Sequence, residues 1–188
     1  MINIEENKAA FKNIISANVN REGIDALMQW LDTTDFYTAP SSSRYHGAEL
    51  GGLCEHSLSV YRRLKFKQED ESNETIALVA LFHDLCKVNF YKQSYRNVKN
   101  DETGKWEKCT CYEINDSLPL GHGEKSALIL SRYIKLSDEE LLAIRWHMSG
   151  FYSSNTGEQS AISSALSISR LVLKLIEADM ESAFWDSK

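Results

Sequence analysis

Apolar side chains recur at helical spacing in the first part of the chain. One face repeats over the first helical stretch, and a second stretch follows with the same period: Phe11, Ile14 and Ile15, then Ile24, Leu27, Met28 and Leu31. Apolar residues three and four positions apart share one face of an α-helix. We therefore expect two short amphipathic helices within residues 1–34.

An irregular segment follows and leads into a third helix. Residues 33–52 contain Pro40, three consecutive serines and three glycines, a composition typical of a loop. The apolar pattern resumes near Leu53 and continues to about Lys67, so a helix carrying His56 is expected there. Polar residues 68–73 then predict another loop.

The next predicted helix, about Glu74 to Lys87, is apolar on nearly every side. Its apolar members are Ile76, Leu78, Val79, Leu81, Phe82 and Leu85. A helix without a polar face is buried in the middle of a domain. We expect this helix to lie at the centre of the fold.

The period changes between residues 88 and 119. The turn sequence of residues 100–104 has aromatic and β-branched residues on both sides, which predicts a β-hairpin. We expect the hairpin aromatics Tyr91, Tyr95 and Trp106 to pack on the helical body rather than to cover a nucleotide base.

Three further helices are expected after the hairpin. One begins near Gly121, a second at Ser137, whose spacing to Glu140 is that of a capping box, and the last runs from about Ser160 to Phe184. The pattern indicates an all-α fold, a single domain over residues 1–188, with a β-hairpin inserted around 88–119.

Composition and charge narrow the classes of function. The net charge is −6 and the sequence pI about 5.4, which disfavours an extended nucleic-acid partner but is neutral about a small phosphorylated ligand. No apolar run is long enough to cross a bilayer, and the N-terminus lacks the pattern of a secretion signal. We expect a cytoplasmic protein without a membrane partner.

The four cysteines do not predict disulfides or a zinc site. Cys109 and Cys111 form a Cys-x-Cys pair, but no second pair completes a tetrahedral set. The expectation is that these thiols are reduced and structurally incidental.

The strongest chemical signal is the dipeptide His83–Asp84 in the buried helix. An unpaired carboxylate there would cost several kcal/mol, so Asp84 needs a hydrogen-bond donor, a cation or a metal ion. Lys87 lies one turn further on, where its ammonium group could reach a phosphate held at such an ion. The alternative for this dipeptide is a structural His–Asp hydrogen bond beside a satisfied lysine.

A second acid lies on the apolar face of the last helix. That face runs Ile168, Leu171, Val172, Leu175, Ile176, and its next position is Asp179. Asp179 therefore points toward the core, where it needs a metal ion or a salt bridge to Arg145 or Lys87.

Five histidines accompany these two aspartates. They are His46, His56, His83, His122 and His147. Any single one is better explained as a core or capping residue, but the whole set with two core-facing carboxylates favours a metal site. Imidazole and carboxylate ligands suit Mn, Fe, Ni, Zn or Mg.

Three motifs in this order resemble the HD-domain superfamily of metal-dependent phosphohydrolases. The opening motif is similar to residues 51–58, the central one to residues 81–87 and the closing one to residues 177–179. The likeness runs from about residue 45 to 184. It implies an HD-domain helical bundle and leaves the N-terminal helices and the hairpin unexplained.

The resemblance also implies a ligand set. One divalent ion would be held by His56, His83, Asp84 and Asp179. In members with two ions, His122 and His147 are added and Asp84 bridges the pair. Cys86 departs from the family, which usually has a small, glycine-like residue before the lysine.

A closer likeness involves residues 45–46 and Gly121–His122. These segments are similar to the HD domain of a bacterial 3′–5′ exoribonuclease. That likeness is at odds with the acidic net charge, and no appended nucleic-acid-binding domain is evident in the sequence.

The expected activity is hydrolysis of a phosphoester in a nucleotide or related small phosphorylated substrate. Asp84 and Lys87 would be the catalytic residues, and Lys87, Arg145 and Arg44 would contact the substrate. Two alternatives remain: a di-iron oxygenase of the same superfamily, and a non-catalytic module that a metal ion stabilises.

Overall fold

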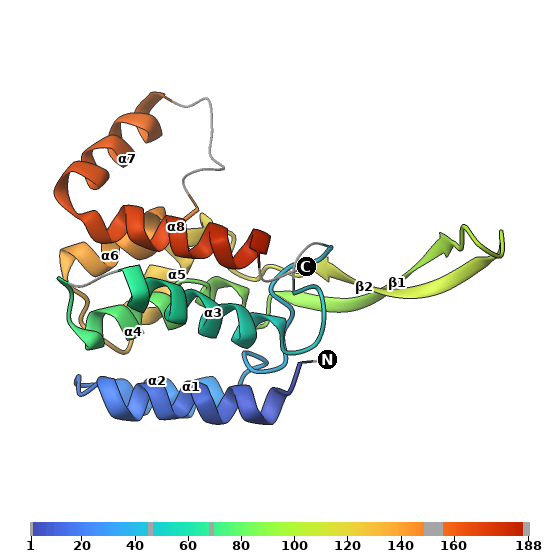
Figure 1. Ribbon diagram of the computed structural model, residues 1–188, viewed down its shortest axis with the longest axis horizontal. Coiled ribbons are helices and arrows are strands. Elements are labelled where there is room, and N and C mark those ends of the chain that lie inside the picture. Colours follow the sequence, from blue (N-terminus) through green and yellow to red (C-terminus); the bar gives the residue numbers. More distant parts are fainter. Residues whose placement is uncertain (1, 45–46, 68–69, 149–155, 186–188) are drawn as a thin grey trace.

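The computed structural model describes residues 2–44, 47–67, 70–148 and 156–185 (Figure 1). Over these residues the chain forms eight α-helices, one 3-10 turn and one antiparallel β-hairpin, so the fold is mainly α as predicted. The elements are α1 Ile4–Asn18, α2 Ile24–Asp32, α3 Gly52–Lys67, α4 Asn73–Phe82, η1 Leu85–Lys87, β1 Tyr91–Lys99, β2 Trp106–Ile114, α5 His122–Ser131, α6 Asp138–Trp146, α7 Thr156–Ile168 and α8 Arg170–Trp185.

Helix α4 lies at the centre of the helical body, as its apolar sequence predicts. Every residue from Ile76 to Phe82 is buried. Helices α1, α3 and α6 pack against it, and α8 lies across α3 and α6. Helix α5 packs on η1 and α6. The chain segments that follow and precede these helices therefore meet near the end of α4.

The two N-terminal helices are confirmed and pack below α3 and α4 in Figure 1. Their main anchor is Phe11, whose ring makes edge contacts with Phe36, Tyr37 and Phe82 at centroid distances of 5.1, 5.8 and 5.5 Å. Such aromatic pairs add to the stabilisation from buried area. The N-terminal segment is thus part of the same hydrophobic core.

The hairpin is confirmed, but its aromatic side chains do not all pack as expected. The strands pair from Tyr91 opposite Ile114 to Lys99 opposite Trp106, and they project away from the helices (Figure 1). Tyr95 is 56% exposed and Trp106 70% exposed. The expectation that these two rings pack on the body is wrong, because only the base of the hairpin lies near it.

The buried central helix is shorter than the sequence predicts. The α-helix ends at Phe82 with His83 as its C-cap, and Asp84 has φ −104° and ψ 21° before the single turn η1. The expected unbroken helix to Lys87 is therefore wrong. The amide of Cys86 leaves the helical pattern and donates to Ser126 Oγ at 3.0 Å.

The predicted C-terminal helix is also two helices, so four helices rather than three follow the hairpin in the described part of the chain. Between α7 and α8 lies the buried Ser169, whose hydroxyl accepts a hydrogen bond from the amide of Leu171 at 3.2 Å. A serine that binds its own backbone competes with helical hydrogen bonds. Apolar periodicity continues across this break, which is why it was missed.

None of the helices in the described ranges is long and apolar enough to span a bilayer.

Candidate metal centre

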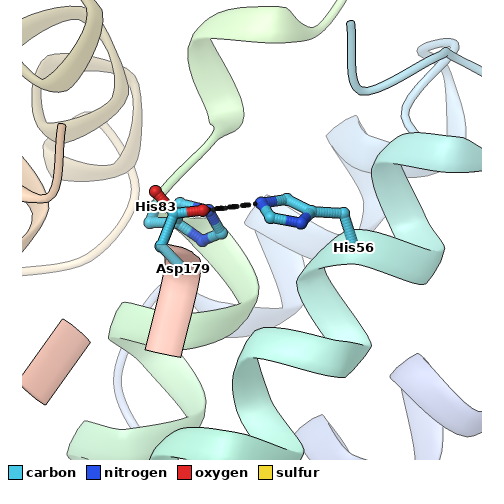
Figure 2. A group of neighbouring side chains, drawn as sticks. All are labelled: His56, His83 and Asp179. Atoms are coloured by element: carbon cyan, nitrogen blue, oxygen red, sulfur yellow. Dashed lines mark hydrogen bonds and ion pairs between the residues drawn. The ribbon is translucent and has the colours of Figure 1, made fainter. Parts of the chain in front are cut away.

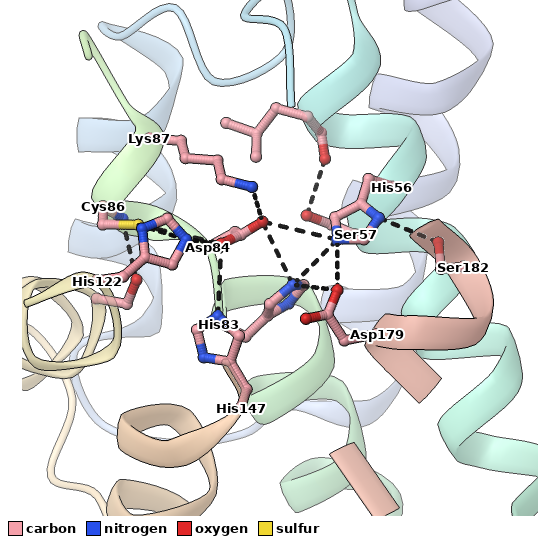
Figure 3. A network of polar contacts seen from close by, with 12 residues as sticks. His56, Ser57, His83, Asp84, Cys86, Lys87, His122, His147, Asp179 and Ser182 are labelled. Atoms are coloured by element: carbon pink, nitrogen blue, oxygen red, sulfur yellow. Dashed lines mark hydrogen bonds and ion pairs between the residues drawn. The ribbon is translucent and has the colours of Figure 1, made fainter. Parts of the chain in front are cut away.

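Side chains from five separate parts of the fold converge on one buried cluster (Figure 3). They come from α3, from the break after α4, from the first residue of α5, from the C-cap of α6 and from α8. In that order they are His56, His83 with Asp84, His122, His147 and Asp179. The six predicted ligands are thus neighbours, although more than 120 residues separate the first from the last.

One side of the cluster is formed by His56, His83 and Asp179 (Figure 2). The two Nε2 atoms lie 3.3 Å apart, and Asp179 Oδ1 lies 3.0 Å from His56 Nε2 and 3.9 Å from His83 Nε2. Asp84 Oδ2 completes this side, 3.6 Å from His56 Nε2 and 3.5 Å from His83 Nε2. Donor atoms around one tetrahedral ion are separated by roughly 3.3 Å, so these four fit a single cation.

The second carboxylate oxygen of Asp84 faces the other two histidines. Asp84 Oδ1 lies 2.9 Å from His122 Nε2 and 3.6 Å from His147 Nε2. The two oxygens of one carboxylate therefore face two separate groups of imidazoles. This is the geometry that a carboxylate bridging two ions requires.

Each of the four imidazoles has an outer partner at Nδ1. His83 Nδ1 lies 2.8 Å from the carbonyl of Ala80, and His147 Nδ1 lies 2.7 Å from that of Ile144. Both histidines are helix C-caps, so each binds a carbonyl that the last helical turn leaves unpaired. A carbonyl oxygen accepts only, so Nδ1 carries the proton and the Nε2 lone pair faces the cluster.

The other two imidazoles are held by side chains. His56 Nδ1 lies 3.0 Å from Ser182 Oγ, and His122 Nδ1 lies 3.2 Å from Cys86 Sγ. Outer partners of this kind fix the orientation of metal-binding histidines in proteins. All four Nε2 atoms are thereby turned toward the two aspartates.

Both carboxylates of the cluster are held in the ionised form. Burial would raise the pKa of Asp84, but the Lys87 charge and the surrounding imidazoles outweigh it and hold the pKa well below the usual value. Burial also acts on Asp179, and the hydrogen bond and charge of His56 lower its pKa below the usual range. Burial lowers the pKa of His122, with Asp84 opposing, so the neutral imidazole is favoured. Neutral imidazoles and ionised carboxylates are the states that bind metals.

One buried polar atom supports a cation at this place. His147 is 1% exposed, and its Nε2 has no hydrogen-bond partner among the described residues. Leaving a buried polar nitrogen unpaired costs about 1–3 kcal/mol. A metal ion between this nitrogen and Asp84 would use the lone pair, so the donor set fits a metal centre on chemistry as well as on distance.

Lys87 lies beside the cluster rather than outside it. Its Nζ donates to Asp84 Oδ2 at 2.6 Å, and the residue is 9% exposed. Burial would lower the pKa of Lys87, but the Asp84 charge raises it above the usual value, so the ammonium form is retained. The alternative in which Lys87 or Arg145 neutralises Asp179 is wrong, because Asp179 is paired with histidines.

The other predicted substrate contacts are not brought to the cluster. Arg145 pairs with Glu124 and its guanidinium lies 4.0 Å from the centroid of the Trp146 ring. Arg44 is exposed in the segment before α3. Tyr45 and His46, which carried part of the closer likeness, lie outside the described residues.

Two supporting residues were not singled out from the sequence. Ser182 follows Asp179 by three positions on α8, so it shares the buried face with Asp179, and this spacing could have identified it. Ser126 holds the backbone at Cys86 from α5, and no sequence signal links the two segments.

Comparison with known families gives one match. The model of the HD domain family matches residues 53–179, a span that includes His56, both predicted aspartates and the break between them. No curated protein and no solved structure matches the chain.

Proposed function

The chain belongs to the HD domain family, and we propose on this basis that its cluster is a one- or two-ion centre that hydrolyses a phosphoester. The substrate would be a nucleotide or a related small phosphorylated compound. The observation that carries the proposal is the convergence of four Nε2 lone pairs and two ionised carboxylates beside a buried ammonium group.

The chain would hold the ions with two groups of side chains that share Asp84. His56, His83 and Asp179 would bind on one side, and His122 and His147 on the other. A divalent ion in such a site acidifies water and polarises a phosphoryl oxygen. The identity among Mn, Fe, Ni, Zn and Mg is part of what the experiment below determines.

Lys87 is the residue best placed to bind the phosphate. Its ammonium group is buried, charged and within 2.6 Å of the shared carboxylate, so it would stabilise negative charge on phosphoryl oxygens near that carboxylate. Asp84 orients this ammonium group and accepts its hydrogen bond. The two residues thus act as one positioned pair.

The substrate would approach from the side of His122. Its side chain is 20% exposed, whereas those of His83 and His147 are fully buried. Glu124, two residues further on α5, holds Arg145 close to this side. A substrate that displaced Glu124 would meet a second cation, so Arg145 remains a proposed substrate contact, and exposed Arg44 a more remote one.

The test combines metal analysis with turnover. Elemental analysis of the purified protein gives the bound ions, and wild-type, Asp84→Asn and Lys87→Met proteins are assayed on bis-p-nitrophenyl phosphate, p-nitrophenyl phosphate and a nucleotide panel. Asp138→Asn, on the exposed start of α6, is the control for loss of a carboxylate. Asp84→Asn should lose bound metal and lower turnover by roughly 10³-fold or more, a typical loss for a group on which the whole site depends.

The two alternatives have their own outcomes. Bound iron with oxygen consumption and no phosphoester turnover would replace the proposal with an oxygenase. Bound metal without turnover, together with unfolding on chelation, would indicate a metal-stabilised module. A wild-type protein that takes up none of the five metals would remove the proposed centre altogether.

A further inference from the structure

A thiol stands beside the second group of donors. Cys86 lies in η1, two residues after Asp84, and is 2% exposed. Its Sγ is 3.6 Å from His122 Nε2 and 4.0 Å from Asp84 Oδ1, while those two atoms are 2.9 Å apart. One nitrogen, one oxygen and one sulfur donor therefore form a closed triangle.

This triangle has the dimensions of one face of a metal-coordination tetrahedron. With Zn–N and Zn–O distances of about 2.0 Å and Zn–S of about 2.3 Å, tetrahedral geometry separates the donors by roughly 3.3–3.6 Å. Each of the three measured separations lies within about half an ångström of that range. Small rotations of the side chains would therefore suffice to bind an ion.

The backbone holds the thiol in this position. The amide of Cys86 donates to Ser126 Oγ at 3.0 Å, which ties η1 to α5, the helix that carries His122. The thiol and the imidazole are thus fixed relative to one another by a contact that involves neither side chain. The same contact keeps Sγ on the Asp84 side of His122.

We propose that Cys86 is a metal ligand, and that Asp84, Cys86 and His122 form a mixed oxygen, sulfur and nitrogen site for a borderline-soft ion such as Zn²⁺ or Co²⁺. This site is the second position of the centre and rests on the proposed function. Thiolate ligands favour such ions over Mg²⁺ and Mn²⁺, whereas His56, His83 and Asp179 offer no sulfur. The two positions of the centre therefore differ in the metals that they select.

The rival role for Cys86 is positional. Its Sγ lies 3.2 Å from His122 Nδ1, so a thiol that is never ionised could simply orient the ring. The two roles differ in one measurable respect, because only a thiolate bound to the ion gives a sulfur-to-metal charge-transfer band. Cobalt makes that band visible.

The experiment is cobalt titration of the full chain by absorption spectroscopy. The Cys109→Ser/Cys111→Ser double variant removes the hairpin thiols first, and Cys86→Ser and Cys54→Ala are then compared on that background. We expect the near-ultraviolet charge-transfer band to persist in the background and in Cys54→Ala. Cys86→Ser should lose it and bind the second cobalt equivalent about tenfold or more weakly, a change typical of losing a ligand contact.

Serine keeps the hydrogen bond to His122 but supplies no thiolate, so a merely positional role predicts an unchanged band. Zinc X-ray absorption of the wild-type chain detects sulfur at the metal directly and does not depend on the folding of a variant. Cobalt or zinc bound without a sulfur signal overturns this inference and leaves the proposed function intact. A chain that binds neither metal overturns both.

Discussion

At the scale of single residues, the side chains around the cluster are oriented by their outer contacts. Backbone carbonyls set the tautomers of His83 and His147, and these contacts persist in any sequence that keeps the two helices. His56 depends instead on a single hydroxyl, that of Ser182. Removing that hydroxyl therefore frees one ring nitrogen without touching a proposed ligand.

We expect Ser182→Ala to weaken metal binding and turnover by about 10–100-fold, the usual cost of losing an outer partner of a ligating histidine. Ser57→Ala is the matched control, because Ser57 is equally buried beside His56 but donates to the carbonyl of Leu53. Metal affinity measured by competition with a chelating dye separates the two. Equal losses in both variants would show that the Ser182 hydroxyl does not orient the ring.

At the scale of elements, the break after α4 creates the site. A straight helix would place His83 and Asp84 on different faces, whereas the turn before η1 lets both face the same cluster. The freed amide at Cys86 is taken up by α5. The end of the central helix is therefore both a helix terminus and the place where three other elements deliver ligands.

A second inter-element contact joins the N-terminal helices to the body. Arg21, between α1 and α2, pairs with Glu140 of α6 at 2.6 Å and with Glu74 of α4 at 3.0 Å. Glu140 is 1% exposed, and it also accepts hydrogen bonds from the amide of Ser137 and the hydroxyl of Thr75. Its carboxylate is thus satisfied only by groups from three different segments.

We expect Glu140→Gln to lower the free energy of unfolding by about 1–3 kcal/mol, because it leaves the Arg21 charge and its hydrogen bonds incompletely paired. Glu139→Gln, exposed on the same helix, is the control and should change stability by less than about 0.5 kcal/mol. Urea unfolding at neutral pH measures both. Equal stabilities would mean that the Arg21 contact contributes nothing.

The same carboxylate makes stability depend on pH. Burial would raise the pKa of Glu140, but the hydrogen bond from Arg21 and the other donors lower it below the ordinary 4.5. A depressed folded pKa gives stability that is fully present above 4.5 and is lost as pH falls through the folded value. Below pH 4.5, the unfolding free energy of Glu140→Gln should therefore fall less steeply than that of the wild type.

The hairpin is the element least connected to the rest. Its strands pair with one another along their whole length, and the described contacts to the body lie at its base, where Asn115 donates to the carbonyl of Phe90 at 2.8 Å. Isolated two-stranded hairpins are at best marginally stable in water. The outer part of the hairpin should thus contribute little to global stability.

We expect that replacing residues 94–111 with an Asn-Gly turn changes the melting temperature by less than about 2 °C, since little buried surface is lost. Metal content should also be unchanged, as the hairpin supplies none of the proposed ligands. Differential scanning calorimetry and elemental analysis test both statements. Loss of bound metal in the shortened chain would show that the hairpin shapes the centre.

At the scale of the whole molecule, the cluster joins distant parts of the chain through polar groups instead of apolar contacts. Asp84 and Asp179 are buried together, and Lys87 is the lysine that pairs with them in the described structure. A bound cation would offset the remaining negative charge and tie α3, α5, α6 and α8 to the end of α4. Metal binding should therefore stabilise the fold as a unit.

We expect chelation to lower the melting temperature by about 5–10 °C, since a ligand at 100 times its Kd contributes about 2.7 kcal/mol and each kcal/mol shifts Tm by roughly 2–4 °C in a domain of this size. The effect should reverse when metal is restored. Asp84→Asn, which should bind no ion, serves as the control and should melt at the same temperature with and without chelator. An unchanged wild-type transition would contradict a resident ion.

Much of the architecture followed from local pattern. The apolar faces of α1, α2 and α8, the apolar surface of α4 and the turn between the strands all lie where residues alone place them, because helical and strand periodicity reflect burial directly. The two helix breaks at His83 and Ser169 did not follow. Apolar periodicity runs through both, and each depends on hydrogen bonds that form only after folding.

The sequence by itself determined which side chains are unusual: two acids at core-facing positions, the imidazoles near helix ends, and a lysine one turn after Asp84. Only the tertiary structure decided that they meet, that the two oxygens of Asp84 face different histidines, and that Ser182 and Cys86 hold the outer nitrogens. The physical reason is that spacing along a helix specifies which face a residue occupies, whereas the packing of separate helices specifies what that face meets.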